Sequence, residues 1–145
     1  MTSSVACGLG SSPVPDGYPA VGGSGAAFDL VVDGVARHDS GGNGAYFVDD
    51  AVVAKQHYQI AGQDTILTVP SLDYGTYSLP DANGNVGFIY DNGGFYDART
   101  RLQISIDGRD GSYVWGSLDG LLTDSFAVTT QPDFPVSGTF AARIR

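Results

Sequence analysis

The stretch Leu102-Gln103-Ile104-Ser105-Ile106-Asp107 alternates apolar and polar residues without a break. This period of two is typical of a β-strand, in which successive side chains point to opposite faces. The last ten residues of the chain repeat the pattern, with apolar or small residues at every second position from 136 to 144. We expect six of these side chains to be buried on one side of a sheet: Leu102, Ile104, Ile106, Val136, Phe140 and Ile144.

The composition extends this prediction to the whole chain. All sixteen acidic residues are Asp, Glu is absent, and glycine occurs 21 times in 145 residues. Asp, Asn and Gly favour turns, whereas a chain without Glu has few surface residues that favour helices. We therefore predict an all-β fold, an antiparallel β-sandwich (jelly-roll or immunoglobulin-like) of about eight to ten strands with at most one short helix.

Two segments test this prediction in detail. Residues 49–61 fit either a short helix near 49–57 or a strand from Gln56 to Ala61, and the alternation of Tyr58 and Ile60 favours the strand. Residues 74–79 and 86–90 flank Asn83-Gly84, a pair of residues typical of tight β-hairpins. The spacing predicts that these two segments pair with each other.

The first 25 residues differ from the rest of the chain. They are rich in Gly, Ser and Pro and almost uncharged, so they cannot form a core of their own. We expect an N-terminal arm over residues 1–25 and a single domain over 26–145, because a chain of this length fits one domain. The arm must pack on the domain or on a neighbouring subunit, and we predict the second, giving a homo-oligomer or filament.

Charge and hydropathy limit the partners. The formal net charge is -9, and the arginines are not clustered. Nucleic acid is therefore excluded as a partner, because phosphate binding requires a basic surface. No apolar run approaches the roughly 18 residues of a membrane-spanning helix. Cys7 is the only cysteine, so no internal disulfide forms.

One turn has the residue types of a cation site. Asp81, Asn83 and Asn85 stand at alternate positions, and a hard cation such as Ca²⁺ prefers their oxygen atoms. The following residues do not complete an EF-hand loop, and turn formation explains the same residues without an ion. Calcium is thus the one candidate cofactor, and these three residues are its candidate ligands.

No catalytic motif emerges from the other polar residues. Asp91 with Asp97, and Asp107 with Asp110, are carboxylate pairs of the kind that hydrolyse glycosides, but their positions also suit turns. His38 and the second histidine, His57, lack neighbours at metal-ligand spacing. Aromatic residues between 74 and 115 suit either the core or an exposed surface that stacks on sugar rings. We predict that the protein is not an enzyme.

Three segments resemble small bacterial surface lipoprotein domains of uncharacterised function: residues 28–34, 67–80 and 136–142. The resemblance spans about residues 26–145 and implies an all-β fold at the outside of the cell, with no known activity. Ser4-Val5-Ala6-Cys7-Gly8 is similar to a lipoprotein cleavage box, whose cysteine is acylated, but it lacks a preceding apolar segment. A small unreactive thiol is the alternative for Cys7.

Together these features predict a non-catalytic structural protein of the extracellular space or cell surface that assembles through its N-terminal arm. The alternative is a calcium-assisted carbohydrate-binding module, which the aromatic residues and the Asp81 turn would serve.

Overall fold

The computed structural model describes residues 13–22, 25–50, 52, 55–81, 84–127, 129 and 131–145, and all its regular elements are strands. The first six are β1 (Ala26–Val32), β2 (Val35–Gly41), β3 (Gly44–Asp50), β4 (Lys55–Ala61), β5 (Thr65–Val69) and β6 (Gly75–Ser78). The other five are β7 (Gly87–Asp91), β8 (Phe95–Asp97), β9 (Leu102–Asp110), β10 (Tyr113–Asp124) and β11 (Phe134–Arg143). The all-β prediction is confirmed, with eleven strands among the described residues instead of eight to ten.

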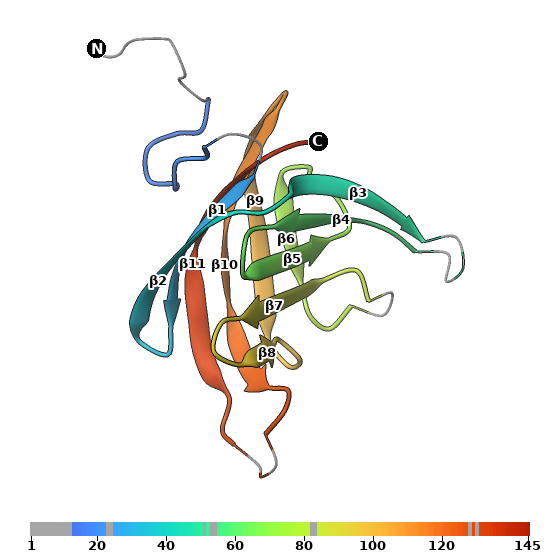
Figure 1. The fold of residues 1–145 in the computed structure, drawn as a ribbon. Coiled ribbons are helices and arrows are strands. Elements are labelled where there is room, and N and C mark those ends of the chain that lie inside the picture. The colour runs from blue at the N-terminus through green and yellow to red at the C-terminus, as the bar shows by residue number, and fades with distance from the viewer. Residues whose placement is uncertain are drawn as a thin grey trace.

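The strands form one antiparallel sheet that curls until it is nearly closed into a barrel shape. Its order is β2-β1-β11-β10-β8-β7-β5-β4-β3. Two further strands lie off this path: β9 pairs with β10, and β6 pairs with β9. A parallel bridge between Ala45 and Ile144 brings β3 next to the end of the chain. Strands β9, β10 and β11 cross β4, β5 and β7 at a steep angle (Figure 1). The β-sandwich, jelly-roll or immunoglobulin-like, stays a prediction.

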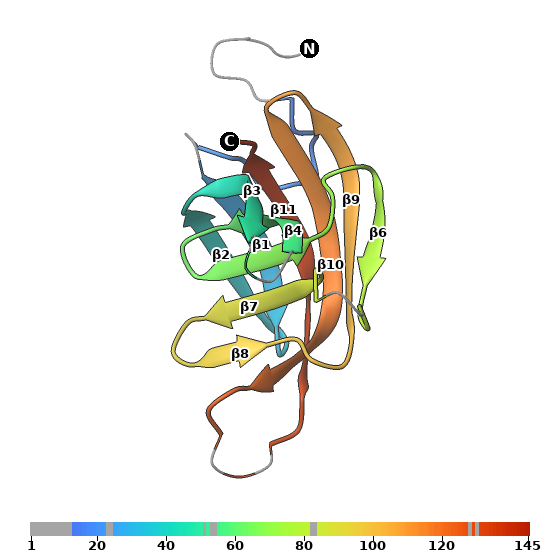
Figure 2. The same cartoon turned by 90° about the vertical axis from the view of Figure 1, so that its right-hand side faces the viewer.

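The core lies between these crossing parts of the sheet (Figure 2). Five of the six predicted core residues are at most 1% exposed, and the sixth, Ile144, is half-buried against them. Phe140 lies opposite Phe28 in the register of β11 and β1, and the two ring centroids are 6.0 Å apart. The alternation found in the sequence therefore identifies the buried face of β9 and β11.

The predicted hairpin around Asn83-Gly84 is wrong. Strand β6 pairs with β9, while β7 pairs with β5 and β8. The segment between β6 and β7 crosses from one part of the sheet to the other, so the two strands lie in different layers. The local turn signal is outweighed here by the burial of Phe88 and Tyr90 in β7, which are 1% and 4% exposed.

Strand β2 was not predicted from the sequence. Its residues Val35 to His38 are all exposed, so they have no alternation of apolar and polar residues to reveal a strand. It is held by pairing with β1 over seven positions rather than by an apolar face. The ambiguous segment is a strand from Lys55 onward, as the alternation of Tyr58 and Ile60 indicated. No residue from 49 to 57 that the structure describes is helical, and residues 51, 53 and 54 lie outside the description.

The described part of the N-terminal arm, residues 13–22, packs on its own domain. The Tyr18 hydroxyl donates a hydrogen bond to Oδ2 of Asp107 in β9 at 2.8 Å, and Pro19 is buried. Burial raises the pKa of the Tyr18 phenol, and the Asp107 carboxylate raises it further. Docking of the arm on a neighbouring subunit stays a prediction, and residues 1–12, which include Cys7, lie outside the described residues.

In the part of the chain that the structure describes, no helix has the length and apolar character needed to cross a membrane.

The buried face of β11 is expected to carry much of the stability. Replacing Phe140 with Ala removes a fully buried ring and leaves a cavity, which should lower the free energy of unfolding by roughly 3–5 kcal/mol. Ser137, which is exposed on the same strand, is the matched control, and Ser137→Ala should change stability by less than about 0.5 kcal/mol. Urea unfolding of both variants measures this; equal effects would contradict the assigned face of β11.

Candidate functional site

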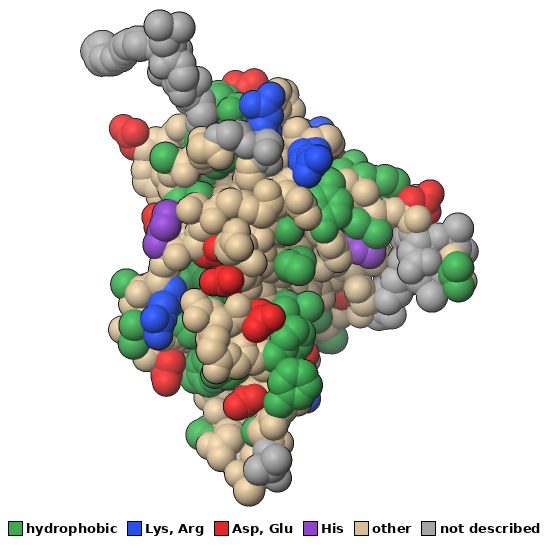
Figure 3. Space-filling model, in the orientation of Figure 1, with side chains coloured by type: hydrophobic (Ala, Val, Ile, Leu, Met, Phe, Trp, Pro, Cys, Tyr) green, Lys and Arg blue, Asp and Glu red, His purple; other side chains and the backbone are tan. Residues whose placement is uncertain are grey.

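The connection from β10 to β11 lies at the end of the molecule opposite the two chain termini (Figure 1). A groove of about 680 Å³ lies there between the β1–β2 turn, strand β8 and the connection from β10 to β11. Seen from one side, hydrophobic and Asp side chains alternate over this half of the surface (Figure 3). Concave sites lined by aromatic rings and a few polar groups are the usual places for small ligands.

Backbone hydrogen bonds hold the walls of the groove in place. The N–H of Asp33 donates to the carbonyl of Pro135 at 2.9 Å, which ties the β1–β2 turn to β11. The N–H of Ser125 donates to the carbonyl of Phe95 at 2.9 Å, which ties the end of β10 to β8. Asp33 and Gly34 have φ angles of 51° and 80°, as a tight hairpin turn of this kind requires.

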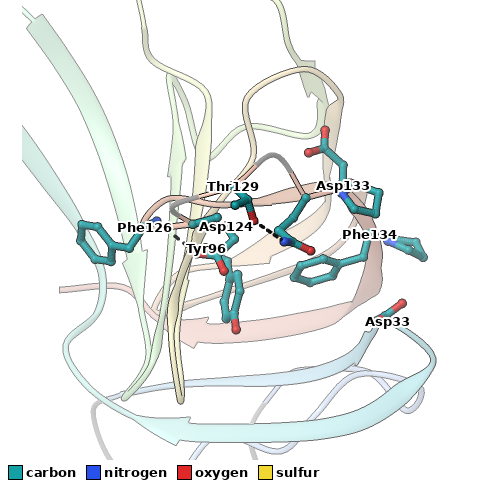
Figure 4. A pocket seen from close by; sticks show the side chains of 11 residues that line it. Asp33, Tyr96, Asp124, Phe126, Thr129, Asp133 and Phe134 are labelled. Carbon is teal, nitrogen blue, oxygen red and sulfur yellow. Dashed lines mark hydrogen bonds between the residues drawn. The ribbon is translucent and has the colours of Figure 1, made fainter.

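Aromatic rings from distant parts of the sequence line the groove. Tyr96 of β8 and Phe134 of β11 are in an edge-to-face arrangement, with their centroids 5.3 Å apart. Figure 4 shows these two rings side by side beneath the loop, with Phe126 farther out. Phe126 is 76% exposed and contacts Phe95 at a centroid distance of 5.5 Å. An exposed ring of this size offers an apolar face to a ligand.

Three carboxylates border the groove and differ in what they already bind. Oδ1 of Asp124 accepts a hydrogen bond from the N–H of Phe126 at 3.1 Å. Asp133 accepts from Thr123 at 2.9 Å and points away from Asp33 (Figure 4). The Asp33 carboxylate is exposed and has no hydrogen-bond partner among the described residues. Asp33 and the second oxygen of Asp124 can therefore accept hydrogen bonds from a ligand.

These carboxylates do not form a metal site. Among the described residues, no group of three or more His, Cys or Asp side chains is arranged to hold a metal ion. Hydrogen-bond acceptors next to aromatic faces are the groups that recognise a ring bearing several hydroxyls, because the apolar face stacks and the hydroxyls donate. The groove therefore presents aromatic faces and hydrogen-bond acceptors side by side.

The candidate calcium ligands are engaged in a turn. The Asp81 carboxylate accepts the N–H of Asn85 at 2.5 Å, and its carbonyl accepts the N–H of Gly84 at 3.0 Å. Oδ1 of Asn85 is buried and has no hydrogen-bond partner in the described part of the chain, which does not include Asn83. The turn explains Asp81 without an ion, and calcium binding stays a prediction.

One member of each candidate carboxylate pair has structural partners. Asp97 accepts hydrogen bonds from Arg99 at 3.0 Å and from Ser125 at 2.7 Å. Asp107 accepts from Tyr18 and from Ser105, both at 2.8 Å. Asp97 is the last residue of β8, whereas Asp107 lies within β9 and not in the turn that the sequence suggested.

The two histidines lie on different strands. His38 of β2 pairs with Asp29 at 2.6 Å, whereas His57 belongs to β4, and its Nδ1 is buried with no hydrogen-bond partner among the residues that the structure describes. The structure therefore does not bring them together as metal ligands.

The aromatic residues between 74 and 115 do not form one platform. Phe88 and Tyr90 are in the core, Trp115 lies on the outer face of β10, and Tyr74 is 78% exposed. Tyr96 alone of this set lines the groove. Sequence reasoning missed Phe126 and Phe134; the one local signal was that they flank a polar stretch that joins two strands.

We expect calcium to have no effect on stability. The melting temperature should be the same in about 1 mM Ca²⁺ as in a buffer without Ca²⁺ that contains about 1 mM of a chelator, because the Asp81 oxygens already accept the hydrogen bonds of the turn. Asp81→Ala should lower stability by about 1 kcal/mol under both conditions, because it removes a hydrogen bond to a backbone N–H. A calcium-dependent rise in melting temperature that Asp81→Ala abolishes would contradict this.

Comparison of the chain with protein-family models, with curated proteins and with solved structures gives no match. The resemblance to lipoprotein domains therefore stays a prediction, and the proposals below rest on the geometry of the groove and the sheet.

Proposed function

We propose that this protein is a non-catalytic domain of the extracellular space or cell surface that binds a carbohydrate in the groove at its loop end. The observation that carries the proposal is one concave site lined by the Tyr96 and Phe134 rings, which contact each other, with Phe126 at its margin and the Asp33 carboxylate on its rim. The exterior location is taken from the resemblance to surface lipoprotein domains. Calcium is not part of the proposal, because the turn engages Asp81.

The groove suits a sugar better than an apolar ligand. Its rim carries polar side chains: Asp33, Asp124, Gln131 and Asp133. An apolar molecule would displace the water that these groups bind and would offer them no hydrogen bonds in exchange. A sugar ring has hydroxyls to donate to these oxygens and an apolar face for an aromatic ring. The backbone hydrogen bonds at Asp33 and Ser125 keep the walls in place before binding, which reduces the entropy cost.

A second candidate is self-assembly through the N-terminal arm, over residues 1–25. It is supported by strand β2, an exposed edge of the sheet that pairs with β1 alone among the described strands. Such an edge has unpaired N–H and C=O groups that an added strand can bind.

The proposal includes the β-sandwich architecture, which the steep crossing of the strands in Figure 1 supports.

A glycan array probed with the full-length protein tests the first function. We expect binding to at least one glycan, and Phe126→Ala should weaken its affinity roughly three- to tenfold, because a stacked ring is lost. Tyr74→Ala is the matched control, since the two side chains are 76% and 78% exposed and Tyr74 does not line the groove. No binding to any glycan, or equal effects of both variants in calorimetric titrations, would contradict the proposal.

Deleting residues 1–25 tests the second candidate function, self-assembly through the N-terminal arm. The shortened protein should remain folded, with the same far-UV circular dichroism, and sediment as a monomer, while the full-length protein sediments as a larger species. Tyr18→Phe keeps the arm and removes only its hydrogen bond to Asp107, so it should still assemble. A monomeric full-length protein, or an unchanged assembly size after the deletion, would rule out this function.

A further inference from the structure

A second hollow adjoins the groove. It encloses about 260 Å³ between the β1–β2 turn and the β7–β8 hairpin, and it shares Asp33, Tyr96 and Phe134 with the groove. Its other polar side chains are Arg37, Tyr90 and Asn92. A ligand that lies against Tyr96 and Phe134 can therefore reach both spaces at once.

Arg37 differs from every other arginine of the protein. The remaining five all have partners: Asp97 for Arg99, Asp119 for Arg101, Asp73 for Arg109, the Tyr113 ring for Arg143 and the Asn43 carbonyl for Arg145. Arg37 has no hydrogen bond or ion pair with any described residue. In a chain with sixteen Asp residues, an unpaired guanidinium beside a hollow is available to a ligand.

The register of β2 aims Arg37 toward the hollow. Arg37 lies opposite Leu30 of β1, which is 2% exposed and belongs to the core. Residues directly opposite each other in an antiparallel pair share a face, so Arg37 projects from the inner side of the edge strand. It lies near the phenol of Tyr90, whose pKa is raised by burial and partly lowered again by the Arg37 charge.

We infer that the carbohydrate of the proposed site is acidic, and that Arg37 binds the carboxylate of a uronic or sialic acid while the sugar ring lies against Tyr96 and Phe134. This inference rests on the proposed function. A guanidinium matches a carboxylate with two parallel hydrogen bonds and remains charged at any physiological pH. The Asp33 carboxylate, on the shared rim, is left to accept hydrogen bonds from hydroxyls.

Two features of the protein bear on the strength of this contact. The net charge of -9 disfavours free anions, but at physiological salt such repulsion is screened beyond about 8 Å. A carboxylate attached to a ring that stacks in the groove is held next to Arg37 by its other contacts. An inward-facing charge on an edge strand also hinders pairing with other chains, so the experiment must separate that role from ligand binding.

The probes are three acidic glycans, each paired with its methyl ester: an oligogalacturonate, a hyaluronan oligomer and sialyl-lactose. The ester keeps the ring and removes the charge. The full-length protein should bind the acid of at least one pair about tenfold more tightly than the ester. Arg37→Gln should remove this preference and leave affinity for the ester unchanged. Arg101→Gln, which alters an exposed arginine directly before β9, should preserve the preference.

Equal binding of acid and ester in all three pairs by the unaltered protein would overturn the inference, while binding of neutral glycans would leave the proposed function standing. A preference for the acid that survives Arg37→Gln would also overturn it. The same variants are measured by sedimentation. If Arg37→Gln changes only the assembly size and not the preference, Arg37 protects the sheet edge and does not bind the ligand.

Discussion

Strand β10 is the wall that both parts of the sheet share. It pairs with β11 from Tyr113 to Leu122, with β9 over most of the same length, and with β8 at Thr123 and Asp124. No other strand contacts both layers through hydrogen-bonded pairs of this kind among the described residues. Because backbone pairing fixes the position of each neighbour along β10, the two layers cannot shift relative to each other without breaking it.

Glycines allow the close packing that β10 requires. A Cβ at Gly116 would overlap the carbonyl oxygen of Ser105 and the ring of Phe140, and one at Gly120 would lie 2.7 Å from the carbonyl oxygen of Arg101. The register with β9 shifts between Trp115 and Gly116, which is a β-bulge. A bulge increases the local twist, and the extra residue on β9, Asp107, is the one that Tyr18 contacts.

A buried carboxylate joins strand β2 to the β4–β5 turn. Asp39 of β2 is 6% exposed and accepts the N–H groups of Gln63 and Asp64, at 3.1 and 2.9 Å. These bonds compensate the cost of burying the charge and join the edge strand to the β4–β5 turn. Strand β10 and Asp39 thus hold the sheet on its two sides. The β1–β2 turn and the connection from β10 to β11 then lie around one groove.

Local alternation and turn residues determined which residues form strands and which faces are buried, as β9 and β11 show. These are properties of neighbouring residues, and the period of two is enough to reveal them. Strand pairing was decided by tertiary structure: Asn83-Gly84 favours a hairpin, yet β6 and β7 lie in different layers. The exposed strand β2 and the groove residues Asp33, Tyr96 and Phe134 were likewise hidden. Contacts between residues roughly 40 to 100 positions apart depend on how the whole chain folds, and the closure of such long loops leaves no pattern in the local sequence.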